Sequence, residues 1–516
     1  MKRRWLTGIA LAGLVYVLLL LLLLAAESAN PQASIRSFSD ALWYSLVTLT
    51  TVGYGDLYPL SPLGRVIGLF FVLLSIGALA SLIGALMAFL RLRVLPALRL
   101  SALQRSDCYL FSACNEPALA LARDLARAEP QACFVFCRET ERPSLGASLS
   151  PRRVFCVPQA ITDLAPRLGG AGKRAVFLIG QDPMENYAAA RRLCKLPLEI
   201  CCFGPETDDL PGVRFFSAAS GIARAYWAAH PLAAEERVVL VQGSGSLARE
   251  ILNQAILVAC REPFQRTVYH LFGDWTDYQR EHPQLAAAFS SAEGDALLFH
   301  HGPWTAQPDL LAQADRLILC QDDFARNGQD ALRLLRYFPL GGPLHVAAAV
   351  VPAPAVAFGA AEETYTGENV LQSALDARAK TLHGLYCRMA GQSEDWDGLP
   401  PFLKMSNRAS ADHLLTKLRL LLPEKDVREI TPEICQEAAR RWRQLPDRAL
   451  CRRNEHLRWT RFYALYNWRY GPEKDAARRT HPCLVPYEQL SREDQEKDDN
   501  AWLQIELLAG KGAQTS

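Results

Sequence analysis

The chain lacks the cysteine spacing of a metal site. It has 14 cysteines among 516 residues, but no Cys-x-x-Cys pair and no cysteine–histidine spacing of the kind that holds zinc. Several cysteines lie instead in apolar runs typical of strands, such as Cys133–Cys137 and Cys201–Cys202. This usage predicts small core residues in a reducing compartment and no catalytic metal.

A strong charge of either sign is also missing. The chain has 56 lysines and arginines against 54 aspartates and glutamates, a formal net charge of +2. This balance argues against a nucleic-acid partner and against a polybasic membrane-binding tail. The sequence also shows no convincing pairing of a nucleophile with a base, so we do not expect an enzyme.

Long hydrophobic runs are few. Only Trp5–Ala26 and Val66–Leu90 are uncharged over a length that can cross a bilayer as a helix. A signal peptide is the alternative for the first run, because Lys2–Arg4 precede it, but the run is long for that role. Basic residues before the first run and after the second predict that both termini are cytoplasmic. Arginines spaced by threes are absent, which argues against a voltage sensor of the usual kind.

The segment Thr51-Val52-Gly53-Tyr54-Gly55 lies between these runs, after a predicted short helix over 38–50. A dehydrated K⁺ is held by rings of backbone carbonyls, which the chain can aim at one axis only by alternating its dihedral angles. Gly53 and Gly55 permit the positive φ values required. The motif therefore predicts K⁺ coordination at Thr51, Val52, Gly53 and Tyr54, with four chains completing each ring. A loop that merely contains Gly-Tyr-Gly is the alternative.

With its flanking runs, this segment resembles the pore of two-transmembrane prokaryotic potassium channels over about residues 5–95. The resemblance implies a pore domain at 1–100 and a homotetramer, multi-pass in the bacterial inner (plasma) membrane and surrounded by lipid. It also implies that Trp43 and Tyr44 brace the filter, although interfacial anchoring would explain them too. Gly77, midway along the second run, is a candidate gate hinge or a helix-packing site.

Apolar strand-like runs then alternate with helical periodicity over two stretches, predicting two α/β domains with parallel sheets at 104–232 and 236–358. We interpret them as a tandem duplication of a Rossmann-type unit. Behind a pore, they resemble the regulator-of-potassium-conductance (RCK) domains of many channels. We expect Pro352 and Pro354 to close the second sheet.

The phosphate loops of the two units differ. The second has Gly243, Gly245 and Ala248 in a GxGxxA pattern, with Asp274 where a ribose-binding acid is expected, so it is the nucleotide-binding candidate. A purely structural turn is the alternative. The first unit has Ser112–Pro117 at this place, without the glycines. We expect no dinucleotide there and interpret that unit as an assembly surface.

The region 362–516 is predicted to be mainly helical and is rich in arginine and aromatic residues. Its blocks 455–459, 467–472 and 480–487 resemble the ryanodine-receptor repeat domain, and the match covers about 370–505. The resemblance suggests a nucleotide-type ligand, for which arginine and aromatic side chains are suited. The candidate contacts are Asn407, Arg408, Lys417, Arg458, Trp459, Trp468, Tyr470 and His481. A core role for the aromatic residues is the alternative.

Together these features predict a multidomain chain: a helical transmembrane pore, two Rossmann-type domains and a mainly helical C-terminal domain. The predicted function is a potassium-selective channel gated by a small molecule that the C-terminal domain senses, with 92–100 transmitting the change to the pore. A channel whose cytoplasmic domains are a scaffold for a protein partner is the alternative. The ligand and the direction of its effect are not encoded in any pattern that we recognise.

Overall fold

The computed structural model describes residues 2–90, 106–139, 143, 153–168, 172–207, 209–291, 293–391 and 395–511. It divides into two compact units, Met1–Arg105 and Ser106–Ser516, each of which is treated by itself. The predicted connection at 92–100 lies outside the described residues.

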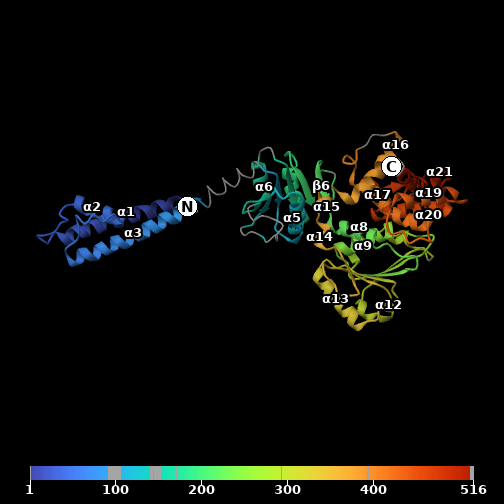
Figure 1. The fold of residues 1–516 in the computed structure, drawn as a ribbon, viewed down its shortest axis with the longest axis horizontal. Coiled ribbons are helices and arrows are strands. Elements are labelled where there is room, and N and C mark those ends of the chain that lie inside the picture. The colour runs from blue at the N-terminus through green and yellow to red at the C-terminus, as the bar shows by residue number, and fades with distance from the viewer. Residues whose placement is uncertain are drawn as a thin grey trace. The chain divides into compact units, whose positions relative to one another are not determined.

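Three helices form the N-terminal unit: α1 (Lys2–Glu27), α2 (Phe38–Leu49) and α3 (Pro62–Phe89) (Figure 1). Helix α3 is long and apolar enough to cross a membrane, and α1 contains the shorter apolar stretch Gly13–Glu27. The fully buried Glu27 accepts hydrogen bonds from the backbone N–H groups of Leu60 and Ser61, at 3.0 and 2.9 Å. It thereby ties the end of α1 to the beginning of α3.

The first α/β domain contains a six-stranded parallel sheet in the order β3-β2-β1-β4-β5-β6. Its elements are β1 (Cys108–Phe111), α5 (Glu116–Ala128), β2 (Cys133–Cys137), β3 (Val154–Val157), α6 (Ile161–Leu164), β4 (Arg174–Leu178), α7 (Pro183–Leu193), β5 (Glu199–Phe203) and β6 (Val213–Phe216). The strands are short and almost wholly apolar, as expected where helices cover a parallel sheet.

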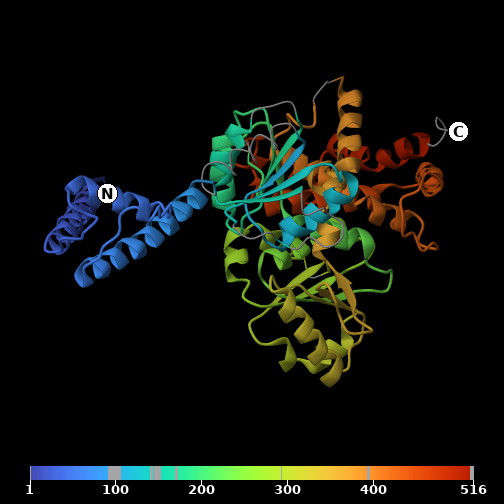
Figure 2. The same cartoon turned by 60° about the vertical axis from the view of Figure 1, so that its left-hand side comes forward.

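The second α/β domain repeats this topology, with strand order β12-β11-β10-β7-β8-β9. Its elements are β7 (Val238–Gln242), α9 (Ser246–Val258), β8 (Val268–Phe272), α10 (Thr276–Glu281), α11 (Leu285–Ala288), β9 (Ala296–His300), α12 (Pro308–Gln313), β10 (Arg316–Leu319), α13 (Phe324–Tyr337), β11 (Leu344–Ala347) and β12 (Val356–Phe358). Helix α9 packs on one face and α12 and α13 on the other (Figure 2).

Two buried asparagines mark the internal repeat. Asn186 joins the end of β4 to β5 by bonds to Gly180 and to the Phe203 carbonyl. Asn327 makes the same set of bonds in the second domain, to Gln321 and to the Ala347 carbonyl. The predicted fold class, with two Rossmann-type domains, is confirmed.

The expectation that Pro352 and Pro354 close the second sheet is wrong. Strand β12 follows both prolines and pairs in parallel with β11, from His345 opposite Val356 to Ala347 opposite Phe358. Its three residues lie at the sheet edge, where a short strand needs no long apolar run, so periodicity did not reveal it.

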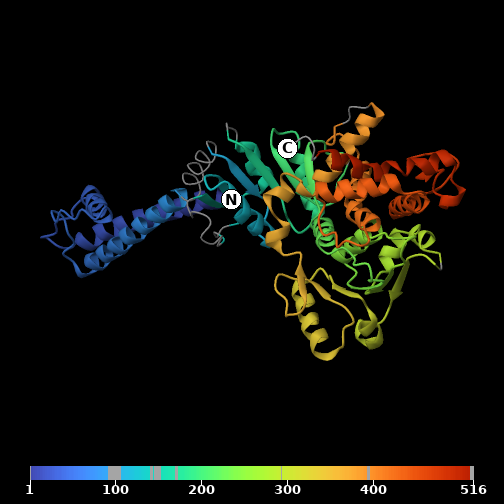
Figure 3. The ribbon, with the colours of Figure 1, turned by 45° about the vertical axis from the view of Figure 1, so that its right-hand side comes forward.

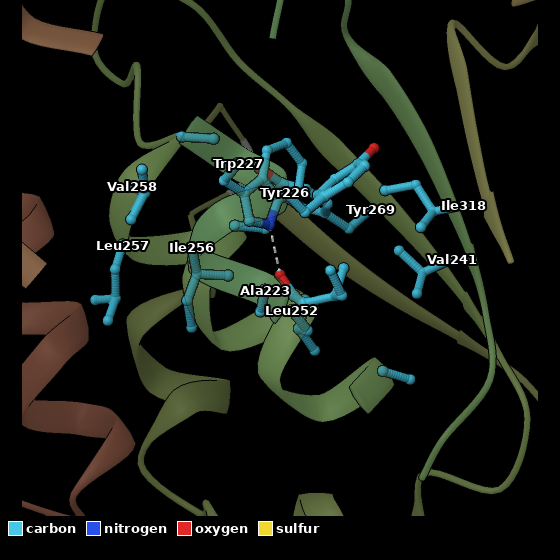
Figure 4. Packing of buried hydrophobic residues seen from close by; sticks show 14 of the residues in the cluster. Ala223, Tyr226, Trp227, Val241, Leu252, Ile256, Leu257, Val258, Tyr269 and Ile318 are labelled. Atoms are coloured by element: carbon cyan, nitrogen blue, oxygen red, sulfur yellow. Dashed lines mark hydrogen bonds between the residues drawn. The ribbon is translucent and has the colours of Figure 1, made fainter. Parts of the chain in front are cut away.

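The two α/β domains exchange elements. Helix α8 (Ala218–Ala229) follows the first sheet but packs into the core of the second domain, where the Trp227 indole donates to the Ile251 carbonyl at 2.9 Å (Figure 4). Conversely, α15 (Gly367–Val370) follows the second sheet, yet Val370 is buried in the core of the first. The domains are therefore packed as one body.

The C-terminal region is mainly helical, as predicted. Its elements are α14 (Ala361–Thr364), α16 (Ala377–Ala390), α17 (Pro401–Asp412), α18 (Leu414–Leu421), α19 (Pro432–Gln444), α20 (Ala449–Leu465), α21 (Arg492–Lys497), α22 (Asn500–Lys511) and the short strands β13 (Arg469–Tyr470) and β14 (Thr480–His481). It has its own core, in which Trp442 and Trp502 stack at 5.3 Å. Helix α20 also packs on the second α/β domain through Phe462 and Leu465 (Figure 3).

Candidate functional site

The backbone at 51–55 alternates in handedness. Thr51, Gly53 and Gly55 have φ values of 61°, 58° and 73°, while α2 ends just before them. Such alternation turns successive carbonyl groups toward the same side of the chain, which is the geometry that a row of cation-binding carbonyls requires. A Cβ on Gly53 would have open space around it, so a substitution there acts through backbone strain.

Trp43 contacts the C-terminal end of this segment. Its indole donates to the Asp56 carboxylate at 2.9 Å, and its ring stacks nearly parallel to that of Tyr54, with centroids 6.2 Å apart. Tyr44 points elsewhere and packs edge-on against Phe71 of α3, at 6.3 Å. Thus Trp43 contacts the segment directly, whereas Tyr44 connects α2 to α3.

Gly77 lies inside α3, which is continuous from Pro62 to Phe89. Its carbonyl accepts a bond from the Ser81 hydroxyl at 2.7 Å, and a Cβ on Gly77 would meet nothing within 4 Å. The position is therefore not closely packed within this single chain.

The loop between β7 and α9 is hydrogen-bonded to a carboxylate of the same domain. Gly243 has φ of 132° and follows β7, and Gly245 precedes the first turn of α9. Asp322, from the end of β10, accepts the backbone N–H groups of Ser246 and Leu247 at 3.0 and 2.9 Å. These are the amides that would otherwise receive a phosphate, so a carboxylate occupies the anion position of the loop.

The other candidates at this loop have local roles. A Cβ on Gly245 would come within 2.3 Å of the Asp322 carboxylate, which explains the need for glycine. Ala248 is fully buried in the domain core. Asp274 is two residues beyond β8 and accepts the Thr276 N–H at 3.1 Å, closing a turn before α10.

In the first domain, Asn115 fills the corresponding place at the start of α5. Its side chain accepts the Ala118 N–H at 3.0 Å and donates to the Ile179 carbonyl at 2.8 Å. The loop 112–117 is thus closed by side chains.

A cavity of about 330 Å³ lies in the C-terminal helical region, between α17, α20 and the segment around α21. Of the eight candidate contacts, the structure brings Asn407, Arg458, Trp459 and His481 to its wall. Trp459 is half-buried and packs against Tyr463 and His481, with ring centroids at 4.3 and 5.0 Å. The wall therefore offers an aromatic face, a guanidinium and an amide within one hollow.

Buried charges support this wall. Glu455 pairs with Arg458 and, at 2.8 Å, with Lys417, and all three side chains are at most 5% exposed. Burial acts to raise the pKa of Glu455, but Arg458 and Lys417 hold it well below its ordinary value. Arg458 Nη1 has no hydrogen-bond partner among the described residues. One guanidinium donor in the wall is thus unpaired.

Asp498 adds a carboxyl group to the cavity wall. Its Oδ2 lies 3.7 Å from His456 Nδ1. Burial, with the nearby charge of Glu455, raises the pKa of Asp498 to about 8. The group is therefore mostly protonated at neutral pH and can act as a donor.

The remaining four candidates lie outside the cavity wall. Lys417 is fully buried behind it and also donates to the Ala501 carbonyl at 3.0 Å. Trp468 is buried in an aromatic cluster with Phe402, and Tyr470, on β13, is 60% exposed. Arg408 forms ion pairs with Asp376 at 2.6 Å and with Glu206, at 2.9 Å, in the first α/β domain.

Helix α17 presents two polar stripes. Ser406, Asn407 and Ser410 line the 330 Å³ cavity. Lys404, Arg408 and Asp412, spaced by four residues, form ion pairs with Glu206, Asp376 and Arg224. The sequence analysis did not identify four acidic site residues, Asp322, Glu206, Glu455 and Asp498. Some of their partners are distant in the chain, and others, such as Arg458, were themselves interpreted as ligand contacts.

Comparisons with known proteins match the N-terminal helical unit and the C-terminal helical region to two different families. Residues 5–91 match a family described as ion channel, and 447–509 match the RyR domain. A voltage-gated potassium channel of Aeropyrum pernix is 53% identical over 58 residues, covering 11% of this chain and 20% of the relative. The N-terminal segment is a potassium-channel pore domain. The calcium-gated potassium channel TvoK of Thermoplasma volcanium is 36% identical over 86 residues, covering 16% of this chain and 25% of TvoK.

This chain thus spans a quarter or less of the length of those two relatives, and the likeness concerns the pore domain. Among solved structures, the GsuK channel is 15% identical and covers 71% of this chain and 98% of that chain, with a TM-score of 0.35. GsuK bound to ADP covers 66% and 90%, at 14% identity and a TM-score of 0.32.

Proposed function

We propose that the chain is the subunit of a potassium-selective, homotetrameric membrane channel gated by a cytoplasmic small molecule. The alternating backbone of Thr51, Gly53 and Gly55 within a potassium-channel pore domain carries the proposal. One chain supplies one side of each carbonyl ring, so four copies are required. Most apolar side chains of α3 are exposed in the single chain, which suits contact with lipid or with other copies.

The proposed sensor is the 330 Å³ cavity of the RyR domain region. Its volume is at the lower end of the range for small-molecule sites. The unpaired Arg458 donor suits an anionic group, and Trp459 offers a face for a flat ring. A mononucleotide or a similarly sized nucleotide derivative combines both features, which supports a nucleotide-type ligand.

Helix α17 is the proposed transmission element. Its Asn407 stripe contacts the ligand, and its Arg408 stripe is ion-paired with Glu206 of the first α/β domain. A ligand shifts the channel only by binding one arrangement of these domains more tightly than another. Because both stripes lie on the same helix, a shift of α17 caused by the ligand would also move the ion pairs with the first α/β domain. Gly77 remains the proposed bend within α3.

A thermal-shift screen of the full chain in detergent micelles, against mononucleotides and cyclic nucleotides, tests the sensor. A ligand that binds the native state stabilises it and so raises the apparent melting temperature. At a hundredfold excess over Kd, the free energy of unfolding increases by about 2.7 kcal/mol. A nucleotide that raises the Tm of the wild type, and raises that of Asn407→Ala less at the same concentration, supports the proposal. If no nucleotide gives a saturable shift, the ligand class is wrong.

A further inference from the structure

A second, larger cavity lies where the C-terminal helices meet the second α/β domain. Its volume is about 1240 Å³, and its wall comes from α8, the segment 230–235, α18 and the loop 423–430. It shares no lining residue with the 330 Å³ cavity. Arginine is prominent in its wall, which includes Arg224, Arg261, Arg316, Arg378, Arg419 and Arg428.

Three of these arginines donate to the backbone of one segment, although Arg316 also makes two bonds to the Glu236 carboxylate, at 2.7 Å each. Arg316 donates to the carbonyls of His230 and Pro231 at 2.5 and 3.1 Å. Arg419 donates to the Leu232 carbonyl at 2.6 Å. Arg261 donates to the Ala233 carbonyl at 2.6 Å. The backbone segment 230–236 is thus held by three guanidinium groups.

Carboxylates pair with most of these arginines but not with Arg261. Arg224 pairs with Asp376 and Asp412, Arg316 with Glu236, and Asp426 with both Arg419 and Arg428. Glu235, Glu424 and Glu429 also line the cavity. Arg261 is 5% exposed, and its bonds go to two carbonyls and the Thr267 hydroxyl, with no carboxylate in ion-pair contact among the described residues. A buried cation without an anion is costly, so an anion in the adjoining cavity would be favourable.

Two buried polar atoms in the wall point to the same conclusion. Arg261 Nε has no hydrogen-bond partner among the described residues, and neither does Nδ1 of His345, which is also 5% exposed. Burial, together with the charge of Arg316, lowers the pKa of His345 to about 3. The imidazole is therefore neutral at physiological pH and can donate one hydrogen bond without adding charge.

We infer that this cavity is an anion-binding site for an oligophosphate group, separate from the proposed sensor. Guanidinium groups bind phosphate oxygens in two-pronged pairs, and several of them around one hollow suit more than one phosphate. Arg261 and Arg419 lie beside the bound group, and the exposed Arg378 is the entrance cation. The bound anion competes with the carbonyls of 230–236 for the same donors and so loosens the segment between α8 and β7.

Isothermal titration calorimetry of the full chain in micelles tests this site, with inorganic tripolyphosphate as the probe and ATP as a second arm. We expect saturable binding of tripolyphosphate that Arg419→Gln weakens at least tenfold and Arg378→Gln weakens severalfold. Arg326→Gln, an exposed arginine on α13 outside this wall, is the matched control and leaves binding unchanged. Asn407→Ala, in the other cavity, also leaves it unchanged.

The two arms distinguish the source of the phosphates. Equal affinities for tripolyphosphate and ATP support recognition of the phosphate chain alone, and tighter binding of ATP supports a nucleotide as its carrier. Arg378→Gln keeps the test decisive if Arg419→Gln does not fold, because Arg378 is exposed. Absence of saturable binding by the wild type, or equal binding by the wild type and Arg378→Gln, would overturn the inference.

Discussion

Arg408 of α17 and Glu206, beyond β5, form an ion pair at 2.9 Å that joins the C-terminal region to the first α/β domain. Both side chains are about four-fifths buried, and Arg408 is also paired with Asp376. Because the solvent screens this pair weakly, its removal should be measurable, unlike that of an exposed ion pair.

We therefore predict coupling between Glu206→Gln and Arg408→Gln. In a double-mutant cycle of the free energy of unfolding, the interaction should be about 0.5–3 kcal/mol, as for residues in one ion-pair network. Glu185→Gln, a largely exposed acid of the same domain, serves as the control for Glu206→Gln. Strictly additive effects would remove Arg408 from the transmission path.

The second prediction concerns Asp322. Asp322→Ala frees the N–H groups of Ser246 and Leu247, so the loop should bind ADP or a nicotinamide dinucleotide at least tenfold more tightly than the wild type does. Asp323→Ala is the matched control, because Asp323 caps α13 and does not touch the loop. Calorimetry is the measurement. If the wild type already binds either nucleotide as tightly as the variant, Asp322 does not block the site.

The third prediction concerns the sensor wall. Asn407→Ala should weaken the nucleotide identified by thermal shift by about 1 kcal/mol, roughly fivefold in Kd, since one neutral hydrogen bond is lost. Tyr470→Ala removes an exposed aromatic side chain outside the cavity and should have no effect. An equal loss of affinity in both variants would place the ligand elsewhere. Arg458→Ala is unsuitable for this test because it removes one of the two cationic partners of the buried Glu455.

The fourth prediction uses the raised pKa of Asp498, about 8 in the folded chain. The unfolded carboxyl titrates near its ordinary value of about 3.9, so between these values the folded state binds the extra proton. Stability from this group is present at low pH and is lost as pH rises toward 8. Asp498→Asn should therefore have a higher Tm than the wild type at pH 8, with the difference vanishing near pH 4. An unchanged difference across this range would contradict the assignment.

The sequence predicted the fold well where a local pattern sufficed. Strand-like runs that alternate with helical periodicity located both Rossmann-type domains, and the RyR blocks located the C-terminal helical region. Strand β12 was missed because three residues at a sheet edge leave almost no periodic signal. The exchange of α8 and Val370 between the domains depends on tertiary packing, which no local pattern records.

The candidate sites were predicted less completely for a related reason. Residue type alone cannot distinguish an arginine that is free to bind a ligand from one that is ion-paired with a carboxylate of the same chain. Arg408 and Lys417 are ion-paired within the chain, whereas Arg458 retains one free donor beside the cavity. Likewise, the GxGxxA pattern indicates a loop whose N–H groups suit an anion, but it does not reveal that the Asp322 carboxylate of the same chain occupies that position.

The central claim is that residues 51–55 form a potassium-selective filter. Its most direct test is the reversal potential of the purified channel in planar bilayers with K⁺ on one side and Na⁺ on the other. The account predicts a K⁺ permeability far above that of Na⁺, and loss of this preference in Gly53→Ala, because a Cβ strains the positive φ. A wild-type reversal potential near zero, showing equal permeability to both ions, would contradict it.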